Sequence, residues 1–348
     1  MIIGLIIIIM LVLILPFLSK IVEHNLEYFL FIMGLAAVLV AGVLSTGLVR
    51  EIMSNHLLYL ITGAVLIAGL LFKFLRKSVD RLITKLLRRM SLQILVVIVI
   101  VLLGLASSII TAIIASLLLV EILHCMPLSR KEKVRINILA CFSIGLGAVL
   151  TPIGEPLSTI VTSRLGGDFW YLFRLLGIYI LPGTMVFGLL SVFVLRGRRK
   201  PQQNGMALNV DEEKSLMLEE KYKEVFLRAF KVFVFVLALE LLGAGFKPVI
   251  DTYIAGLNGR FLFWGNMISS ILDNATLAAA EISPIMTQMQ IRAILMGLLI
   301  SGGMLIPGNI PNIISASKLR IKSKEWAIFG APLGFAVMVV YFAILFVL

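Results

Sequence analysis

Long apolar runs dominate the chain and alternate with short polar segments. A helix that crosses a hydrocarbon core about 30 Å thick needs roughly 20 apolar residues. Runs of about this length or longer cover residues 1–19, 27–49, 56–72, 137–165, 169–195, 228–246, 291–317 and 325–348. The pattern predicts an all-α polytopic membrane protein, because a helix satisfies its own backbone hydrogen bonds inside lipid.

Two further runs are predicted to enter the membrane and return on the same side. Residues 91–126 are too long for one span and lie between basic segments, and the hydroxyl-rich SSIIT at 107–111 is the natural place for a turn. Such a re-entrant hairpin is allowed where its irregular tip is buried in protein or faces water. The same threading makes residues 255–289 a second hairpin, entered from the opposite side, with SSILDNAT (269–276) at its tip.

The charges fix the expected orientation. Of the 348 residues, 60% are hydrophobic and 14% are charged, and the formal net charge is +12. The basic residues cluster in short segments between the spans, at 73–89, 130–135, 196–200 and 318–324. This is the positive-inside pattern. It predicts a lipid bilayer rather than nucleic acid as the partner, with basic loops in the cytoplasm and both termini outside.

A repeat is visible after each predicted hairpin. Pro152 and Pro156 interrupt the first long run in LTPIGEPLS, and Pro307 and Pro311 interrupt the second in IPGNIPNII. The order of hairpin, broken helix and helix therefore occurs twice, and the threading makes the two copies inverted. Inverted repeats with discontinuous helices are a design of secondary transporters, in which the breaks mark the binding site.

The chain is accordingly predicted to have four parts. Residues 1–72 form N-terminal transmembrane helices that act as a scaffold, and residues 196–227 form a cytoplasmic linker. The first repeat, 73–195, contains an amphipathic surface helix at 73–90, the hairpin 91–126, the broken helix 137–165 and the helix 169–195. The second repeat, 228–348, contains the helix 228–246, the hairpin 255–289, the broken helix 291–317 and the helix 325–348.

Oxygen-bearing side chains collect at the hairpin tips and the breaks. Proline removes a backbone donor and glycine tolerates unwound backbone, so half-helix ends and free carbonyls are expected there. The predicted breaks consist of Pro152, Gly154, Pro156, Pro307, Gly308 and Pro311. The predicted cation- and proton-binding residues are Asp273, Asn274, Glu155, Thr151, Asn309, Ser107, Ser108, Thr111 and Ser270. Oxygen ligands of this kind suit a hard cation such as Na⁺.

Structural roles remain open for several of these residues. Asp273 could lie at a wetter depth and be satisfied by hairpin amides. Glu155 could cap the half-helix that starts there, where a carboxylate suits the positive dipole end. Glu240 is a possible additional ligand, or else a helix–helix contact. Other polar side chains are expected outside the site, at the membrane interface for Glu121, Glu281 and His124 and in the apolar core for Cys125 and Cys141.

The motifs TPIGEP and LDNAT resemble the ion transporter superfamily, most closely its NhaD-type Na⁺/H⁺ antiporters and a related group of prokaryotic cation transporters. The resemblance covers roughly residues 73–348. It implies that Asp273 and Asn274 form the cation- and proton-binding pair, and that Glu155 stands where these antiporters usually have aspartate. It also implies a homodimer with an elevator-like transport domain in a prokaryotic plasma membrane.

The sequence favours exchange of Na⁺ or Li⁺ for H⁺, with no cofactor and no enzymatic reaction. Removing a carboxylate from water favours its protonated form, and a cation beside it favours its charged form, so one site holds either ion but not both. The alternative is a Na⁺-coupled symporter of a carboxylate or other anion, although no Lys or Arg falls near the centre of a span. A non-transport membrane protein would have little reason for duplicated broken helices.

Overall fold

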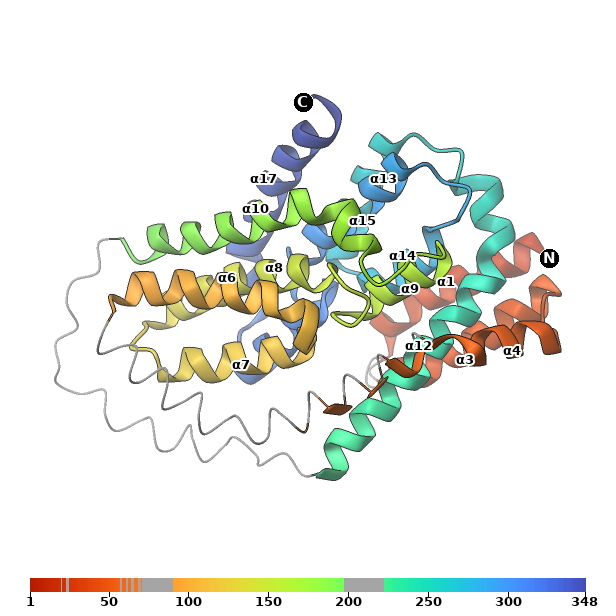
Figure 1. Ribbon diagram of the computed structural model, residues 1–348, viewed down its shortest axis with the longest axis horizontal. Coiled ribbons are helices and arrows are strands. Elements are labelled where there is room, and N and C mark those ends of the chain that lie inside the picture. Colours follow the sequence, from red (N-terminus) through yellow and green to blue (C-terminus); the bar gives the residue numbers. More distant parts are fainter. Residues whose placement is uncertain are drawn as a thin grey trace.

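The computed structural model describes residues 1–19, 21–22, 25–56, 58–60, 62–63, 66–67, 70, 90–196 and 222–348. Within these ranges every regular element is a helix (Figure 1). Three of the described helices are long and apolar enough to cross a membrane: α6 (Leu92–Ile110), α10 (Tyr171–Val194) and α17 (Ser323–Phe346). The predicted all-helical class with apolar, membrane-type helices is confirmed. The predicted surface helix at 73–90 lies outside the described residues except at its last position, and most of the predicted linker, 197–221, does so as well. The linker prediction is wrong at its C-terminal end, because residues 222–227 already belong to the helix Tyr222–Val249, which was predicted to start at 228.

The N-terminal helices form one group with a helix from the middle of the chain. This group contains α1 (Ile2–Leu18), α3 (Leu26–Ala41), α4 (Thr46–Ser54) and α12 (Tyr222–Val249). The helix α12 packs along α3 (Figure 1), and an ion pair of 2.5 Å joins Lys231 to Glu27. The expected span 27–49 is wrong at its C-terminal end, because Gly42 takes the left-handed φ of 70° that ends α3.

The first predicted hairpin is a pair of helices, α6 and α7 (Ala112–Cys125), which lie side by side (Figure 1). The chain reverses at Thr111, within the SSIIT segment, where φ is 75° and ψ is 150°. Thr111 is also the N-cap of α7, and its hydroxyl oxygen accepts a hydrogen bond of 3.5 Å from the Ile114 amide. A β-branched residue in this conformation is uncommon, and the cap bond helps to hold it.

Both long runs that contain paired prolines are interrupted helices. The first consists of α8 (Arg130–Ala148) and α9 (Pro156–Arg164), and the second of α15 (Gln288–Gly302), the short 3₁₀ turn η3 (Ile306–Gly308) and α16 (Ile310–Lys318). The expected starts at 137 and 291 are too late. Each helix begins with a capping box, formed by Ser129 with Glu132 and by Thr287 with Gln290. These first turns are polar, so a prediction based on apolar runs leaves them out.

The second predicted hairpin is less regular than the first. After α12 the chain makes a π-helical turn, η1 (Ile250–Ile254), and then forms α13 (Gly259–Gly265), which tightens into the 3₁₀ turn η2 (Asn266–Ser270). The second half is α14 (Asn274–Glu281), and Asp273 is its N-cap. The SSILDNAT segment therefore contains the junction between the two halves of this hairpin.

The two broken helices share their backbone geometry where the second segment starts and ends. The N-cap residues are extended in both, with φ −157° and ψ 161° at Glu155 and φ −154° and ψ 147° at Asn309. Just beyond the segments, Gly166 and Arg320 have left-handed φ values of 59° and 51°. The intervals from Glu155 to Gly166 and from Asn309 to Arg320 are equal, so the same local structure occurs twice.

Each half of the molecule packs one helix of its hairpin against the broken helix of the other half. The helix α14 packs against α9, and α7 packs against α16. In each case the second helix of one hairpin contacts the second segment of the broken helix from the other half. This crossed packing brings α9, which starts just after Glu155, against α14, which starts at Asn274.

Candidate functional site

The two predicted carboxylates converge where α9 meets α14. Glu155 is the N-cap of α9 and Asp273 is the N-cap of α14, so the packing of these helices brings the carboxylates within electrostatic range of one another. The side chain of Asn274 is a further neighbour of the Glu155 carboxylate. Glu155 and Asn274 are buried, with relative exposures of 3% and 2%. The structure thus brings together three of the predicted site residues.

Asp273 is half-buried and caps its helix. Its Oδ2 atom accepts hydrogen bonds from the Thr276 amide at 2.9 Å and from the Thr276 hydroxyl at 3.1 Å. An aspartate is among the best N-cap residues, and the positive end of the helix dipole favours its charged form. The structural role that the sequence left open for Asp273, satisfaction by hairpin amides, is therefore present alongside its proximity to Glu155.

Glu155 is less completely satisfied by its own helix. Its backbone amide donates to the Ser158 hydroxyl at 3.4 Å, and Pro156 occupies the first helical position, where proline is well tolerated. Within the described residues, Glu155 Oε1 and Asn274 Nδ2 are buried without a hydrogen-bond partner. Burying such an unpaired group costs about 1–3 kcal/mol. The Glu155 oxygen can accept a proton or bind a cation, whereas the Asn274 amide nitrogen can only donate a hydrogen bond.

The tip of the first hairpin is tied to the first break. The Thr151 hydroxyl donates to the Ser108 carbonyl, and the Ala112 amide donates to the Gly154 carbonyl at 2.8 Å. The Ser107 hydroxyl lies within hydrogen-bond distance of the Gly104 carbonyl of its own helix and the Ile144 carbonyl of α8, and its single proton is shared between them. Each of these hydroxyl oxygens keeps lone pairs after donating its proton. Ser107, Ser108, Thr111 and Thr151 therefore lie together beside the break that ends at Glu155.

The expectation of free carbonyls at the breaks is wrong for several positions. The Pro152 carbonyl accepts a hydrogen bond of 2.9 Å from the Thr159 hydroxyl. In the second break, the Asn312 side chain donates to the carbonyls of Gly302 and Leu305, both at 2.8 Å. Side chains from the following half-helix fold back onto the carbonyls that the break exposes. The sequence contained a signal for Asn312, the second asparagine of GNIPN, but its role as a donor was missed.

The second break packs against its own hairpin and against α8. A Cβ atom added to Gly308 would clash with the Ser269 carbonyl oxygen, and Ser270 beside it is half-buried. Asn309 is 1% exposed, and a Cβ added to Gly145 of α8 would lie 2.5 Å from its side-chain nitrogen. Asn309 Oδ1 is another buried atom without a partner in the described structure.

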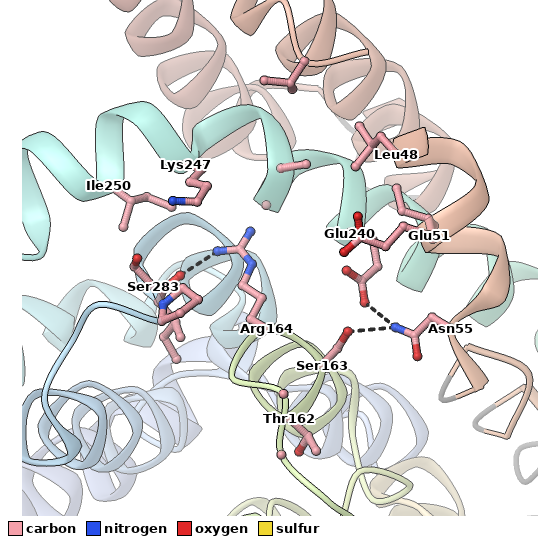
Figure 2. Close-up of a pocket in the computed structure, with 18 of the residues that line it drawn as sticks. Leu48, Glu51, Asn55, Thr162, Ser163, Arg164, Glu240, Lys247, Ile250 and Ser283 are labelled. Atoms are coloured by element: carbon pink, nitrogen blue, oxygen red, sulfur yellow. Dashed lines mark hydrogen bonds between the residues drawn. The ribbon is translucent and has the colours of Figure 1, made fainter. Parts of the chain in front are cut away.

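Glu240 lies at the other end of α9. Its Oε1 atom accepts a hydrogen bond of 3.1 Å from Asn55, whose side chain also donates to the Ser163 hydroxyl at 2.7 Å (Figure 2). Since α9 has nine residues and rises 1.5 Å per residue, roughly 12 Å of helix separates Ser163 from Glu155. Glu240 therefore belongs to a different cluster from Glu155 and Asp273.

The remaining polar residues have local partners. Glu281 accepts a hydrogen bond of 2.8 Å from Asn266, and the His124 ring nitrogen Nδ1 lies 2.7 Å from the Val120 carbonyl oxygen. Glu121 is buried within the protein. Cys141 is buried, with its sulfur 3.2 Å from the Ser315 hydroxyl, and Cys125 is half-buried. Among the described residues no group of three or more His, Cys, Asp or Glu side chains could hold a metal ion.

Comparisons with known proteins identify a family but not an activity. No curated protein matches the chain. One family model does match, over residues 2–348, and its description is "Protein of unknown function (DUF1646)". Because this match extends over nearly the whole sequence, the chain belongs to the DUF1646 family.

Proposed function

We propose that the protein is a secondary active transporter that exchanges Na⁺ or Li⁺ for H⁺ at the Glu155–Asp273 pair. The observation that carries the proposal is the convergence of these two carboxylates at the start of α9 and α14. Asn274 and the hydroxyls around Thr151 supply further oxygen and amide groups nearby. Carboxylate, amide and hydroxyl oxygens are the ligands that hard cations prefer.

The electrostatics of the pair favour competition between a cation and a proton. Two carboxylates in a poorly solvated site repel one another, and burial penalises each negative charge. A bound Na⁺ relieves the repulsion while both groups stay ionised, and a proton relieves it by neutralising one of them. Because a bound cation and a bound proton each relieve the repulsion, binding of one favours release of the other. This competition couples the flux of the cation to the flux of protons.

The arrangement of the helices supports an alternating-access mechanism. Matching backbone geometry at the two broken helices and the crossed packing of α14 on α9 and α7 on α16 are what an inverted repeat with two re-entrant hairpins requires. In this proposal the helices around the site move as a transport domain against the group of α1, α3, α4 and α12, in the manner of an elevator. The homodimer is part of the same proposal.

Capping of the two helices does not account for the pair by itself. Asp273 Oδ2 is occupied as a cap, but Glu155 Oε1 is buried and takes part in no described hydrogen bond. An amide in place of a carboxylate would cap either helix and would carry no charge to repel its neighbour. The presence of two acidic side chains at this contact therefore favours a role that requires their charge.

The test is an exchange assay in proteoliposomes with an imposed pH gradient. We expect Na⁺ or Li⁺ added to wild-type vesicles to collapse the gradient, and Glu155→Gln to abolish the collapse. The matched control is Asp168→Asn, because Asp168 is an acidic side chain that is 63% exposed in a surface loop. Failure of the wild-type protein to respond to either cation, or a full response from Glu155→Gln, would refute the proposal.

A further inference from the structure

A cavity of about 750 Å³ lies away from the carboxylate pair, at the C-terminal end of α9 (Figure 2). It is bounded by α4, by the loop after α9, by α12 and by the segment that follows α14. The charged and polar side chains that line it include Glu51, Asn55, Ser163, Arg164, Glu240 and Lys247. These residues come from three distant parts of the chain.

One side of the cavity is basic. The Arg164 guanidinium donates through Nη1 to the Ile282 carbonyl at 2.8 Å and rests on the bare Cα of Gly243, where an added Cβ would clash with Nη2. Nη2 itself is buried and has no hydrogen-bond partner in the described structure. The guanidinium is thus held in place with a spare donor. Lys247 lines the same side (Figure 2).

The opposite side of the cavity is acidic. Figure 2 shows Glu240 and Glu51 together, across from Arg164 and Lys247. The hydrogen bond from Asn55 to Glu240 Oε1 orients that carboxylate. The cavity therefore presents positive groups on one wall and carboxylates on the other.

The charges on the two walls do not neutralise one another directly. Lys247, near the end of α12, forms an ion pair of 2.5 Å with Asp251 in the adjoining turn η1. Arg164 interacts through space with Glu240 and also with Asp251, but among the described residues no ion pair joins Arg164 to either carboxylate. A guanidinium and a carboxylate that face each other across a space, without meeting, are complementary to a ligand that carries both charges.

We propose that this cavity binds a small zwitterion of the amino-acid type. Its carboxylate would bind Arg164, because a planar guanidinium with spare donors suits a carboxylate, and its ammonium group would bind between Glu240 and Glu51. A simple anion would face the two carboxylates, and a simple cation would face Arg164, so neither satisfies both walls. The inference is independent of cation exchange, because it rests on a different set of residues.

The test is isothermal titration calorimetry on the full chain purified in detergent. The probes are glycine, β-alanine and 4-aminobutyrate, in which the distance between carboxylate and ammonium increases, together with butyrate and butylamine, which carry one charge each. We expect at least one zwitterion to bind saturably and roughly tenfold or more tightly than either single-charge probe, because only the zwitterion makes both charged contacts.

Variants locate the binding in this cavity. Arg164→Gln and Glu240→Gln should each weaken the binding of the zwitterion roughly tenfold or more, provided that size-exclusion chromatography shows a folded protein. The control Arg260→Gln removes an exposed arginine that does not line the cavity and should leave binding unchanged, as should Asp273→Asn at the carboxylate pair. Equal binding of butyrate or butylamine, no binding of any zwitterion, or undiminished binding by folded Arg164→Gln would overturn the proposal.

Discussion

Thr111 and Asp273 occupy equivalent positions but differ in charge. Each is the N-cap of the second helix in its hairpin, and each accepts a hydrogen bond from the amide three residues later. A hydroxyl suffices for capping, since threonine and aspartate are both good N-caps. The negative charge at Asp273 is therefore more than its position requires, and its neighbour Glu155 supplies a second one.

The two roles of Asp273 can be separated by substitution. Asparagine caps a helix about as well as aspartate, whereas alanine loses about 1 kcal/mol. We expect Asp273→Asn to unfold thermally at nearly the wild-type temperature and Asp273→Ala to unfold earlier, while neither exchanges Na⁺ for H⁺. The measurements are thermal unfolding in detergent and the proteoliposome assay. If Asp273→Asn exchanged Na⁺ for H⁺ as the wild type does, Asp273 would act only as a helix cap.

A second residue-scale prediction concerns the close approach of α6 and α8. A Cβ atom on Gly147 would clash with the Gly104 carbonyl oxygen, so the helices must separate to accommodate alanine. We expect Gly147→Ala to destabilise the protein by about 1–3 kcal/mol, as overpacking typically does. The matched control is Gly265→Ala, where an added Cβ meets nothing within 4 Å. Thermal unfolding compares the two, and equal stabilities would contradict the packing described.

At the scale of elements, prolines and apolar runs located the interruptions, but local capping decided where helices begin and end. The polar first turn of α8 was missed because Ser129 and Glu132 stabilise it through hydrogen bonds rather than burial. The end of α3 was missed because the left-handed residue Gly42 lies within an apolar run. The partners of the break carbonyls, such as Asn312, could not be derived, because they depend on how the following half-helix folds back.

An ion pair closes the loop that connects α9 to α10. Arg174, in the first turn of α10, donates to both carboxylate oxygens of Asp168 at 2.8 and 2.9 Å, and the Trp170 amide donates to Asp168 Oδ1 at 3.0 Å. The hydrogen bond from Arg174 holds the pKa of Asp168 below its usual value. The contribution to stability is therefore present above the usual pKa of aspartate and is lost as the pH falls through the lowered pKa.

Thermal unfolding of Asp168→Asn measures this contribution. At neutral pH the variant should unfold at a slightly lower temperature than the wild type, because the pair is exposed and weak. The difference should shrink as the pH approaches and passes below the pKa of Asp168, where the wild-type side chain is also neutral. A Lys131→Gln variant serves as the control for loss of one exposed charge elsewhere. A difference that is constant with pH would exclude the ion pair as its cause.

At the scale of the whole molecule, residues that the charge pattern predicts on the same side of the membrane contact each other in the structure. The basic segments around Arg130 and Arg320, both predicted in the cytoplasm, meet in the structure. On the other predicted side of the membrane, Arg164 contacts Ile282.

The cavity between Arg164 and Glu240 could not have been predicted from the charge pattern. Its walls come from separate segments, and in the sequence Arg164 resembles an ordinary residue of an external loop.

The proposed inversion of the two halves makes a prediction about sidedness. The turns after α9 and after α16 have matching conformations, with left-handed residues at Gly166 and Arg320. If the halves are inverted, these equivalent turns lie on opposite sides of the membrane. A parallel repeat would place them on the same side. The distinction does not depend on which ion is transported.

Cysteine labelling in intact cells tests this arrangement. In a background with Cys125 and Cys141 replaced by alanine, single cysteines are introduced as Asp168→Cys and Lys322→Cys, at exposed positions of the two turns. We expect a membrane-impermeant maleimide to label position 168 from outside, and position 322 only after permeabilisation, because the basic segment 318–324 favours the cytoplasm. Labelling of both positions from outside, or of neither before permeabilisation, would exclude the inverted repeat. Such a result would also remove the symmetry argument for alternating access at the Glu155–Asp273 pair.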